Sequence, residues 1–293
     1  MINRPWTLKL EFSKGCNLSC KFCPIHALPE YNKNKQFLTT TTCERVVSQY
    51  AKINPEGRVE LTMRGEPTIN PYFLKNISLI RKHLPKSQIS LFSNGVTALK
   101  DPTIIAKSFV AGVNIYNIDC YNNTYERFKK LAEEITTKYN AVELKKFEEF
   151  SAYTKYSKGH LLKVINLVPD IASPDNPVAA RSLHTNAGNA DIESLYKLGM
   201  PKLKKLPLVR QCGRPFREMV VCYNGDVVIC CHDWKAEKVL GNVYSKHLYN
   251  IWYGEEHSEI LKKLYVKDRA LISPCNKCDY IGEHRLSLLK DPR

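Results

Sequence analysis

The chain of 293 residues is organised around one stretch near its start, Cys16-Asn17-Leu18-Ser19-Cys20-Lys21-Phe22-Cys23. Three thiols in a CxxxCxxC spacing, just after a short apolar strand, can converge on one metal cluster. A closed structural site takes four protein ligands, whereas three leave one coordination position for a substrate or cofactor. Two alternatives remain: a zinc site with His26 as its fourth ligand, or three unrelated core cysteines.

Composition and length indicate an ordinary globular protein. The chain can form one large α/β domain and a small appendage, and 43% of its residues are hydrophobic. It has no apolar run of 18 residues, so we expect no transmembrane helix. The first residues lack the apolar core of a secretory signal, which predicts a cytoplasmic protein.

The eleven cysteines are an odd number and follow no export signal. Their grouping in CxxxCxxC and CxxC patterns favours metal ligation in a reducing compartment over disulfide formation. The formal net charge of +15 is the other unusual property. A surface this basic attracts nucleic acid, acidic membranes or phosphorylated substrates, although a cell with a basic proteome would explain it equally well.

The three-cysteine stretch, with Phe22 as its aromatic residue, resembles the CxxxCxΦC signature of the radical S-adenosylmethionine (SAM) superfamily. The resemblance implies that Cys16, Cys20 and Cys23 hold a [4Fe–4S] cluster. It also implies that the amino and carboxylate groups of SAM occupy the fourth iron of that cluster.

Apolar runs and helical periodicities alternate along the first two thirds of the chain, as in βα units with a parallel sheet. Five strands are recognisable and a sixth is expected to be irregular. The radical SAM resemblance implies an open (β/α)6 barrel, with its site at the carboxyl ends of the strands. The predicted strands are 8–12, 59–63, 89–93, 113–120 and 161–168, and the predicted helices are 39–53, 71–84, 102–111 and 124–139.

Polar motifs follow several of these strands. Gly65-Glu66-Pro67 ends the second strand, where a carboxylate can accept hydrogen bonds from an ammonium group and glycine permits close backbone approach. It resembles the GGEP motif that holds the SAM amino group. Arg64 replaces the first glycine of that motif and is a candidate to contact the SAM carboxylate or the substrate.

Further candidates for SAM contacts lie at the ends of the next strands. For Ser93 and Asn94, a turn that simply ends the strand is an equally good explanation. The usual adenine-binding motif of the family is not recognisable, and no catalytic residue beyond the SAM cluster is assigned. These cofactor-binding candidates are Ser93, Asn94, Asp119 and Asn166.

A second set of thiols, Cys212, Cys230, Cys275 and Cys278, resembles the auxiliary-cluster modules called SPASM and twitch. Asn224-Gly225 between two β-branched runs predicts a hairpin over 219–231, and helices are expected over 248–253 and 259–265. The resemblance implies a second [4Fe–4S] cluster with all four positions filled. Structural zinc is the alternative, as is Cys231 or Cys222 in place of Cys230.

The predicted architecture is therefore α/β, with a radical SAM core over residues 1–200 and an auxiliary iron–sulfur module over 201–293. Cys43, Cys120 and Cys222 are expected to be core thiols. Polar residues near the junction are candidates for proton transfer or substrate binding, with a structural role as the alternative; they are His184, Asn186, Asn189, His232 and Asp233. A set of basic residues before the auxiliary module could bind the phosphates of a nucleic acid or form a solvent-exposed face. The set comprises Lys202, Lys204, Lys205, Arg210, Arg214 and Arg217.

The resemblance implies reductive cleavage of SAM to a 5′-deoxyadenosyl radical that abstracts a substrate hydrogen atom. A fully ligated auxiliary cluster suits electron transfer, so we expect a net oxidation; isomerisation or rearrangement of a nucleotide or nucleic-acid base is the alternative. A non-enzymatic iron–sulfur protein is the third hypothesis. The expected partners are a small-molecule, peptide or nucleotide substrate and a reductant such as flavodoxin or ferredoxin, and the charge is compatible with nucleic acid.

Overall fold

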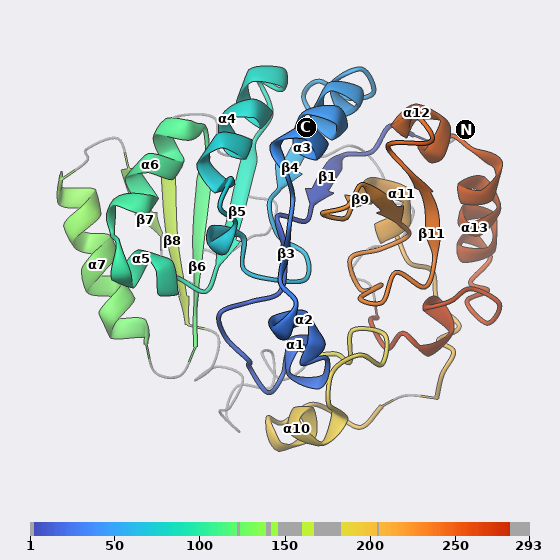
Figure 1. The fold of residues 1–293 in the computed structure, drawn as a ribbon. Helices are drawn as coiled ribbons and strands as arrows, with labels where there is room; N and C mark the ends of the chain where they lie inside the picture. The colour runs from blue at the N-terminus through green and yellow to red at the C-terminus, as the bar shows by residue number, and fades with distance from the viewer. Residues whose placement is uncertain are drawn as a thin grey trace.

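A nine-stranded sheet forms the framework of the protein (Figure 1). The computed structural model describes residues 3–121, 124–138, 142–145, 160–166, 183–203 and 205–281. The ends of the predicted segments 124–139 and 161–168, and Lys204 of the basic set, lie outside these residues. The strand order is β11-β10-β9-β1-β4-β5-β6-β8-β7.

Six neighbouring strands of this sheet are parallel, which confirms the α/β class with a large parallel sheet. The sixth strand, β7, was expected to be irregular, and that expectation is wrong. Its four residues pair in regular parallel register with β8, which lies between β6 and β7 in the sheet. The six strands are β1 (Thr7–Leu10), β4 (Arg58–Glu60), β5 (Ile89–Ser93), β6 (Ile115–Cys120), β7 (Val142–Lys145) and β8 (His160–Asn166).

The other edge of the sheet is extended by the predicted hairpin. Strand β9 (Glu218–Val221) pairs in parallel with β1, and β10 (Asp226–Val228) and β11 (Val239–Asn242) continue from it in antiparallel fashion. The hairpin turn contains Gly225 at φ +89°, a backbone conformation that favours glycine. The C-terminal segment is thus continuous with the sheet, and the domain boundary near residue 200 stays a proposal.

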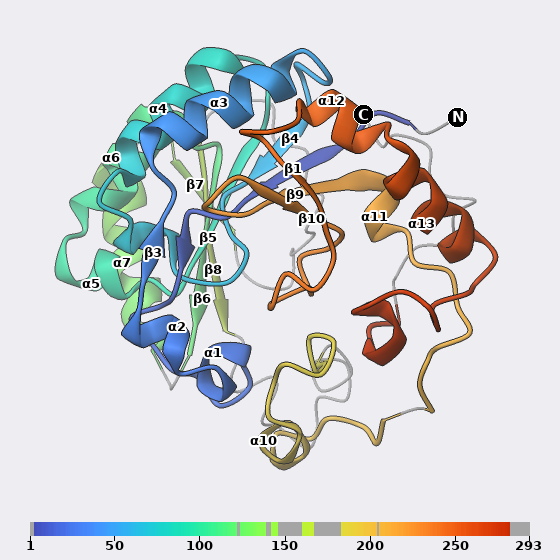
Figure 2. The same ribbon diagram turned by 45° about the vertical axis from the view of Figure 1, so that its right-hand side comes forward.

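The longer helices cover the outer face of the curved sheet (Figure 2). Helix α3 begins where the Thr39 side chain accepts a hydrogen bond from the Thr42 amide, and it buries Val46, Val47 and Tyr50 against the sheet. The helices on this face all bury apolar side chains against the sheet. They are α3 (Thr40–Ala51), α4 (Phe73–His83), α5 (Val96–Lys100), α6 (Thr103–Ala111) and α7 (Tyr125–Lys138).

Short elements surround the carboxyl ends of the parallel strands, and two helices follow the hairpin. Helix α13 starts four residues earlier than predicted, because Glu255 and Glu256 form an acidic first turn that suits a helix N-terminus. The remaining elements are β2 (Ser13–Lys14), β3 (Gln36–Phe37), α1 (Pro24–Ala27), α2 (Glu30–Lys33), the 3₁₀ helix η1 (Pro67–Ile69), α10 (Ile192–Lys197), α11 (Arg214–Arg217), α12 (Leu248–Trp252), α13 (Glu255–Tyr265) and the 3₁₀ helix η3 (Cys275–Lys277). No helix in the described part of the chain is both long and apolar enough to cross a bilayer.

Candidate active site and iron–sulfur centres

The loop that carries the three N-terminal cysteines is held by hydrogen bonds from a neighbouring helix. The Asn32 side chain of α2 accepts from the Cys16 amide at 2.7 Å and donates to the Leu18 carbonyl at 3.0 Å. Cys23 is the residue before α1, and Pro24 starts that helix. Part of the loop geometry is therefore set by contacts within the first 33 residues.

The three thiols are partly buried and lie close enough to influence one another. Burial, together with the neighbouring thiols of the set, raises the pKa of Cys20 to about 11 and that of Cys23 to about 12. Three adjacent soft thiolates are the donor set of an iron–sulfur cluster with one open iron. No three His, Cys, Asp or Glu side chains among the described residues are arranged to hold a single metal ion. A cluster does not require that arrangement, because each thiolate binds a different iron.

The Gly65-Glu66-Pro67 loop lies directly against the cysteine loop. Gly65 and Gly15 form a parallel β-bridge, and the Glu66 amide donates to the Gly15 carbonyl at 3.0 Å. A Cβ atom at Gly65 would lie 2.1 Å from that carbonyl oxygen, so only glycine fits. Two motifs about 50 residues apart in the sequence are thereby brought into backbone contact.

The Glu66 side chain ties two strand ends together. Its carboxylate accepts four hydrogen bonds: from the Thr68 amide and hydroxyl, from Ser93 Oγ at 2.8 Å and from the Asn94 amide at 2.8 Å. Burial raises its pKa. Oε1 accepts three of these hydrogen bonds and Oε2 accepts one, and the contact of this motif with the SAM amino group stays a proposal.

Asn94 connects the third strand end to the cysteine loop. Its Nδ2 donates to Asn17 Oδ1 at 2.8 Å and lies 3.4 Å from Cys16 Sγ. Gly95 follows with φ +73°, and a Cβ there would collide with the Phe128 ring. The structure thus brings together the cysteine loop, Gly65–Pro67 and Ser93–Asn94, as the positions of these motifs at strand ends predicted.

Arg64 does not reach the site, so the expectation that it contacts SAM or substrate is wrong. Its side chain is buried and makes two hydrogen bonds of 2.5 Å to the carboxylate of Glu11. A third, of 2.9 Å, goes to the carbonyl of Trp234, which also accepts from the Tyr31 hydroxyl. Arg64 therefore links the strand ends to the C-terminal segment.

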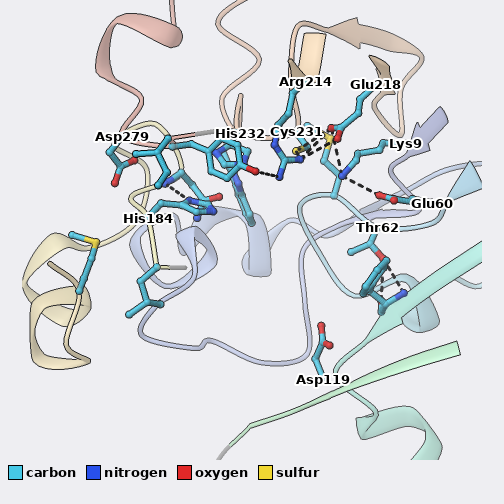
Figure 3. A pocket seen from close by; sticks show the side chains of 18 of the residues that line it. Lys9, Glu60, Thr62, Asp119, His184, Arg214, Glu218, Cys231, His232 and Asp279 are labelled. Atoms are coloured by element: carbon cyan, nitrogen blue, oxygen red, sulfur yellow. Dashed lines mark hydrogen bonds and ion pairs between the residues drawn. The ribbon is translucent and has the colours of Figure 1, made fainter. Parts of the chain in front are cut away.

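A cavity of about 820 Å³ opens beside these strand ends. It is lined by Met63, two residues before Gly65, by Phe92, one residue before Ser93, and by Asp119 near the end of β6. Figure 3 shows Asp119 separated from the other labelled charges of the cavity. Burial, and then the Glu66 carboxylate, raise the pKa of Asp119 to about 7. Asn166 ends β8 in register with Cys120, next to Asp119.

The four C-terminal thiols also lie near one another. Burial raises the pKa of Cys275 and Cys278 to about 12, and the Cys212 thiolate adds to both shifts. Cys212 acts in the same way on Cys230, whose pKa is raised first by its hydrogen bond with Cys231 and then by burial. Four thiols, from a loop, the hairpin, η3 and the residue that follows η3, are therefore gathered as the spacing predicted, and their role as ligands stays a proposal.

The remaining cysteines have other surroundings. Cys43, Cys120 and Cys222 are buried in apolar clusters, which confirms them as core thiols. Cys231 lines the cavity, 3.3 Å from Arg214 Nη1. Its hydrogen bond from Cys230, followed by the nearby Lys9 and Arg214 cations, lowers its pKa well below that of an ordinary thiol. This position supports Cys230, and not Cys231 or Cys222, as the fourth thiol of the set.

Sequence reasoning missed the charged side chains that strands β1, β4 and β9 place in the cavity wall. Burial would lower the pKa of Lys9, but the anions around it, Cys231, Glu218 and Glu60, raise it. The sequence signal for Lys9 was its position between two leucines, Leu8 and Leu10, which are both buried. Because alternate strand residues face opposite sides of a sheet, Lys9 faces the side opposite to the leucines. Arg214 joins this wall, so it does not belong to a solvated basic face, and Arg217 is buried as well.

Among the junction residues, the two histidines lie in the cavity wall. The rings of His184 and His232 stack with centroids 4.4 Å apart, and Tyr280 packs against both. Burial, followed by the charges of His232 and Arg214, lowers the pKa of His184 well below its usual value.

The other junction residues differ in position. Asn186 also lines the cavity. Asp233 and Asn189 are structural: the first accepts from the amides of Glu237 and Lys238, and the second donates to the carbonyl of Asn186.

Comparison with known protein families identifies the class of protein. Residues 10–144 match the radical SAM superfamily, and residues 212–279 match SPASM, an iron–sulfur cluster-binding domain. The chain belongs to the radical SAM superfamily and carries a C-terminal SPASM-type region. SAM and [4Fe–4S] clusters are the cofactors of this class.

Two curated relatives show how far the similarity extends. An S-adenosyl-L-methionine-dependent 2-deoxy-scyllo-inosamine dehydrogenase from Niallia circulans is 18% identical over 94% of this chain and 93% of its own length. A GTP 3′,8-cyclase from Pasteurella multocida (strain Pm70) is 32% identical over 38% of this chain. The second match spans 33% of the cyclase.

Two solved structures share the fold. The crystal structure of BtrN in complex with AdoMet and 2-DOIA superposes with a TM-score of 0.68 at 15% identity, covering 96% of this chain and 95% of BtrN. Native anSMEcpe with bound AdoMet gives 0.52 at 18% identity, covering 88% and 84%. These similarities confirm the radical SAM architecture with its C-terminal region.

Proposed function

We propose that this protein is a radical SAM dehydrogenase that oxidises an alcohol group of a small polar substrate to a carbonyl group. The observation that carries the proposal is the alignment with the dehydrogenase of Niallia circulans over nearly the whole length of both chains. The gathering of four C-terminal thiols supports it, because a fully ligated cluster is suited to accept an electron.

Each group of residues has a role in this proposal. Cys16, Cys20 and Cys23 hold the SAM cluster, and the four C-terminal thiols hold the auxiliary cluster. When bound, SAM and the two clusters supply a radical that removes a hydrogen atom from the alcohol carbon and an acceptor for the remaining electron. The loops at Gly65–Pro67 and Ser93–Asn94, with Asn166, position SAM beside the cysteine loop. The cavity excludes bulk water from the reacting groups.

Oxidation of an alcohol also releases the hydroxyl proton, and we assign its uptake to Asp119. Although the sequence suggested a SAM contact, the side chain lines the cavity. A base with a pKa near the working pH is the most effective, and that of Asp119 is raised to about 7 by burial and by Glu66. Tyr121 and Cys120, the other titratable groups that interact with Asp119, have their own pKa values raised and stay neutral near pH 7.

The proposed function is tested by anaerobic reconstitution of the full chain with iron, sulfide and SAM, followed by reduction with dithionite. With 2-deoxy-scyllo-inosamine and related amino alcohols as probes, we expect 5′-deoxyadenosine and a product lighter by two hydrogens, both detected by mass spectrometry. Absence of 5′-deoxyadenosine in a sample with full iron content would remove the enzyme claim. A product of unchanged mass would indicate isomerisation instead.

Asp119→Asn should lower kcat/KM for alcohol oxidation by about 100-fold or more, the usual contribution of a general base. Because the carboxylate is the active form, wild-type kcat/KM should rise with pH through about 7, and the variant should lose this dependence. Asp101→Asn, at an exposed site before α6, is the control and should behave as wild type. An unchanged pH profile in Asp119→Asn would contradict the assignment.

The reductant and the compartment complete the proposal. All eleven cysteines are free, which supports the reducing cytoplasm, where a flavodoxin or ferredoxin would supply the electron for SAM cleavage. A nucleotide substrate is the second candidate, because a GTP 3′,8-cyclase is 32% identical to this chain over 113 residues. Binding of nucleic acid to the basic surface would be recognised by its steep loss with salt.

A further inference from the structure

One wall of the cavity carries four charged side chains in a row of alternating sign, which we call the charge row: Glu60, Lys9, Glu218 and Arg214 (Figure 3). Lys9 Nζ lies 2.9 Å from Glu60 and 3.6 Å from Glu218, and Arg214 Nη1 lies 3.1 Å from Glu218. The four side chains are between 8% and 20% exposed. The row is thus a continuous ion-pair network that faces the cavity from β4, β1, β9 and α11.

We propose that the charge row binds the hydroxyl groups of a polyhydroxylated substrate that carries no phosphate. This inference rests on the proposed alcohol oxidation and narrows its substrate class. A hydroxyl group both donates and accepts hydrogen bonds, whereas carboxylates only accept and ammonium or guanidinium groups only donate. A surface on which acceptors and donors alternate therefore matches neighbouring hydroxyl groups along a ring or chain.

The pairing within the row disfavours phosphate. Lys9 has a carboxylate on each side, and Arg214 is bound to Glu218 and to the Tyr280 hydroxyl at 3.0 Å. A phosphate at either cation would approach Glu218, and in this poorly hydrated wall the repulsion between like charges is only weakly screened. Phosphate sites in proteins usually offer cations without such competing carboxylates.

The remaining contacts show that the row is fixed before a ligand arrives. Arg58 holds Glu60 from outside the row at 3.2 Å. Burial would raise the pKa of Glu60, but Lys9 and Arg58 lower it, so the carboxylate stays ionised. Such preorganised charges can replace the water molecules around a sugar or cyclitol without rearrangement.

Calorimetric titration of the reconstituted full chain with SAM tests the proposal. The probes are two matched pairs, glucosamine with glucosamine 6-phosphate and myo-inositol with myo-inositol 1-phosphate, and GTP. We expect at least one unphosphorylated compound to bind about tenfold or more tightly than its phosphate ester. Tighter binding of both esters or of GTP would overturn the proposal, and so would no measurable binding of either unphosphorylated compound.

Variants connect this preference with the row. Glu218→Gln and Glu60→Gln should each weaken binding of the unphosphorylated probe about tenfold and reduce the discrimination against its ester. Glu256→Gln, which alters an exposed ion pair with Lys238, is the matched control and should change neither. Circular dichroism shows whether each row variant folds. If one does not, the other row variant and the preference of the wild-type protein for the unphosphorylated probe still test the proposal. Row variants that behave like Glu256→Gln would contradict the proposal.

Formation of 5′-deoxyadenosine in the same samples separates this inference from the proposed function. If it forms after reduction while the phosphate preference is reversed, the charge-row inference fails and the radical SAM function stands. If it does not form, the proposed function fails whatever the probes do.

Discussion

Cys20→Ala is expected to lower the formation of 5′-deoxyadenosine by about 1,000-fold or more, because residues that act as one catalytic unit fail together. Removal of one of the three thiolates leaves only two iron ligands, and the loop contains no fourth cysteine that could replace the lost one. The iron content should fall from about eight to about four per chain, since the four C-terminal thiols are unaffected. Anaerobic chromatography of the nucleoside product and iron analysis measure the two effects.

Cys43→Ala provides the matched control for this prediction. Cys43 is a fully buried residue of α3 and belongs to neither thiol set, so its loss should cost some stability but leave iron content and SAM cleavage within about twofold of wild type. Cleavage of SAM by Cys20→Ala at the wild-type rate would show that the cysteine loop is not the radical-generating site.

Arg64→Met is expected to produce the largest loss of stability. Glu11 is fully buried and its carboxylate receives two hydrogen bonds from Arg64. Removal of one partner from a buried pair leaves an uncompensated charge and typically costs about 3–5 kcal/mol of unfolding free energy. For a chain of this size the melting temperature should fall by about 10 °C. The variant also loses one of the hydrogen bonds that join the strand ends to the C-terminal segment, the bond from Arg64 to the Trp234 carbonyl.

Two further variants identify the cause. Arg64→Met combined with Glu11→Gln should regain a large part of the lost melting temperature, because no charge is then buried alone. Lys86→Met breaks an exposed pair with Glu56, whose side chains are 77% and 55% exposed, and should lower the melting temperature by no more than about 2 °C. Equal effects of Arg64→Met and Lys86→Met, in thermal scans followed by circular dichroism, would contradict the role assigned to the buried pair.

These predictions depend on the sequence and on the tertiary structure to different degrees. The cysteine loop, the strand and helix order and the hairpin could be predicted, because each depends on the spacing of residues a few positions apart. The hairpin at Asn224-Gly225 is such a local signal. Its attachment to the free edge of β1 is not, since pairing between distant strands leaves no periodicity in either one.

The candidate site divides in the same way. Cys16, Cys20 and Cys23 lie within eight residues, so their spacing alone indicated a cluster with one open position. Which side chains surround that cluster was decided by contacts over long separations. Arg64 looked available until its partner proved to be Glu11, 53 residues earlier.

By itself, the sequence indicated a metal site with one open position, because metal ligation requires particular side chains at particular spacings. Its resemblance to the radical SAM superfamily then implied two iron–sulfur clusters and radical chemistry. Only the tertiary structure decided what faces the cavity. Glu66 is used within the protein, Asp119 is left in the cavity, and Lys9 lies between two carboxylates from neighbouring strands. The physical reason is that burial and charge pairing are properties of the folded assembly of strands and cannot be read from any one segment of it.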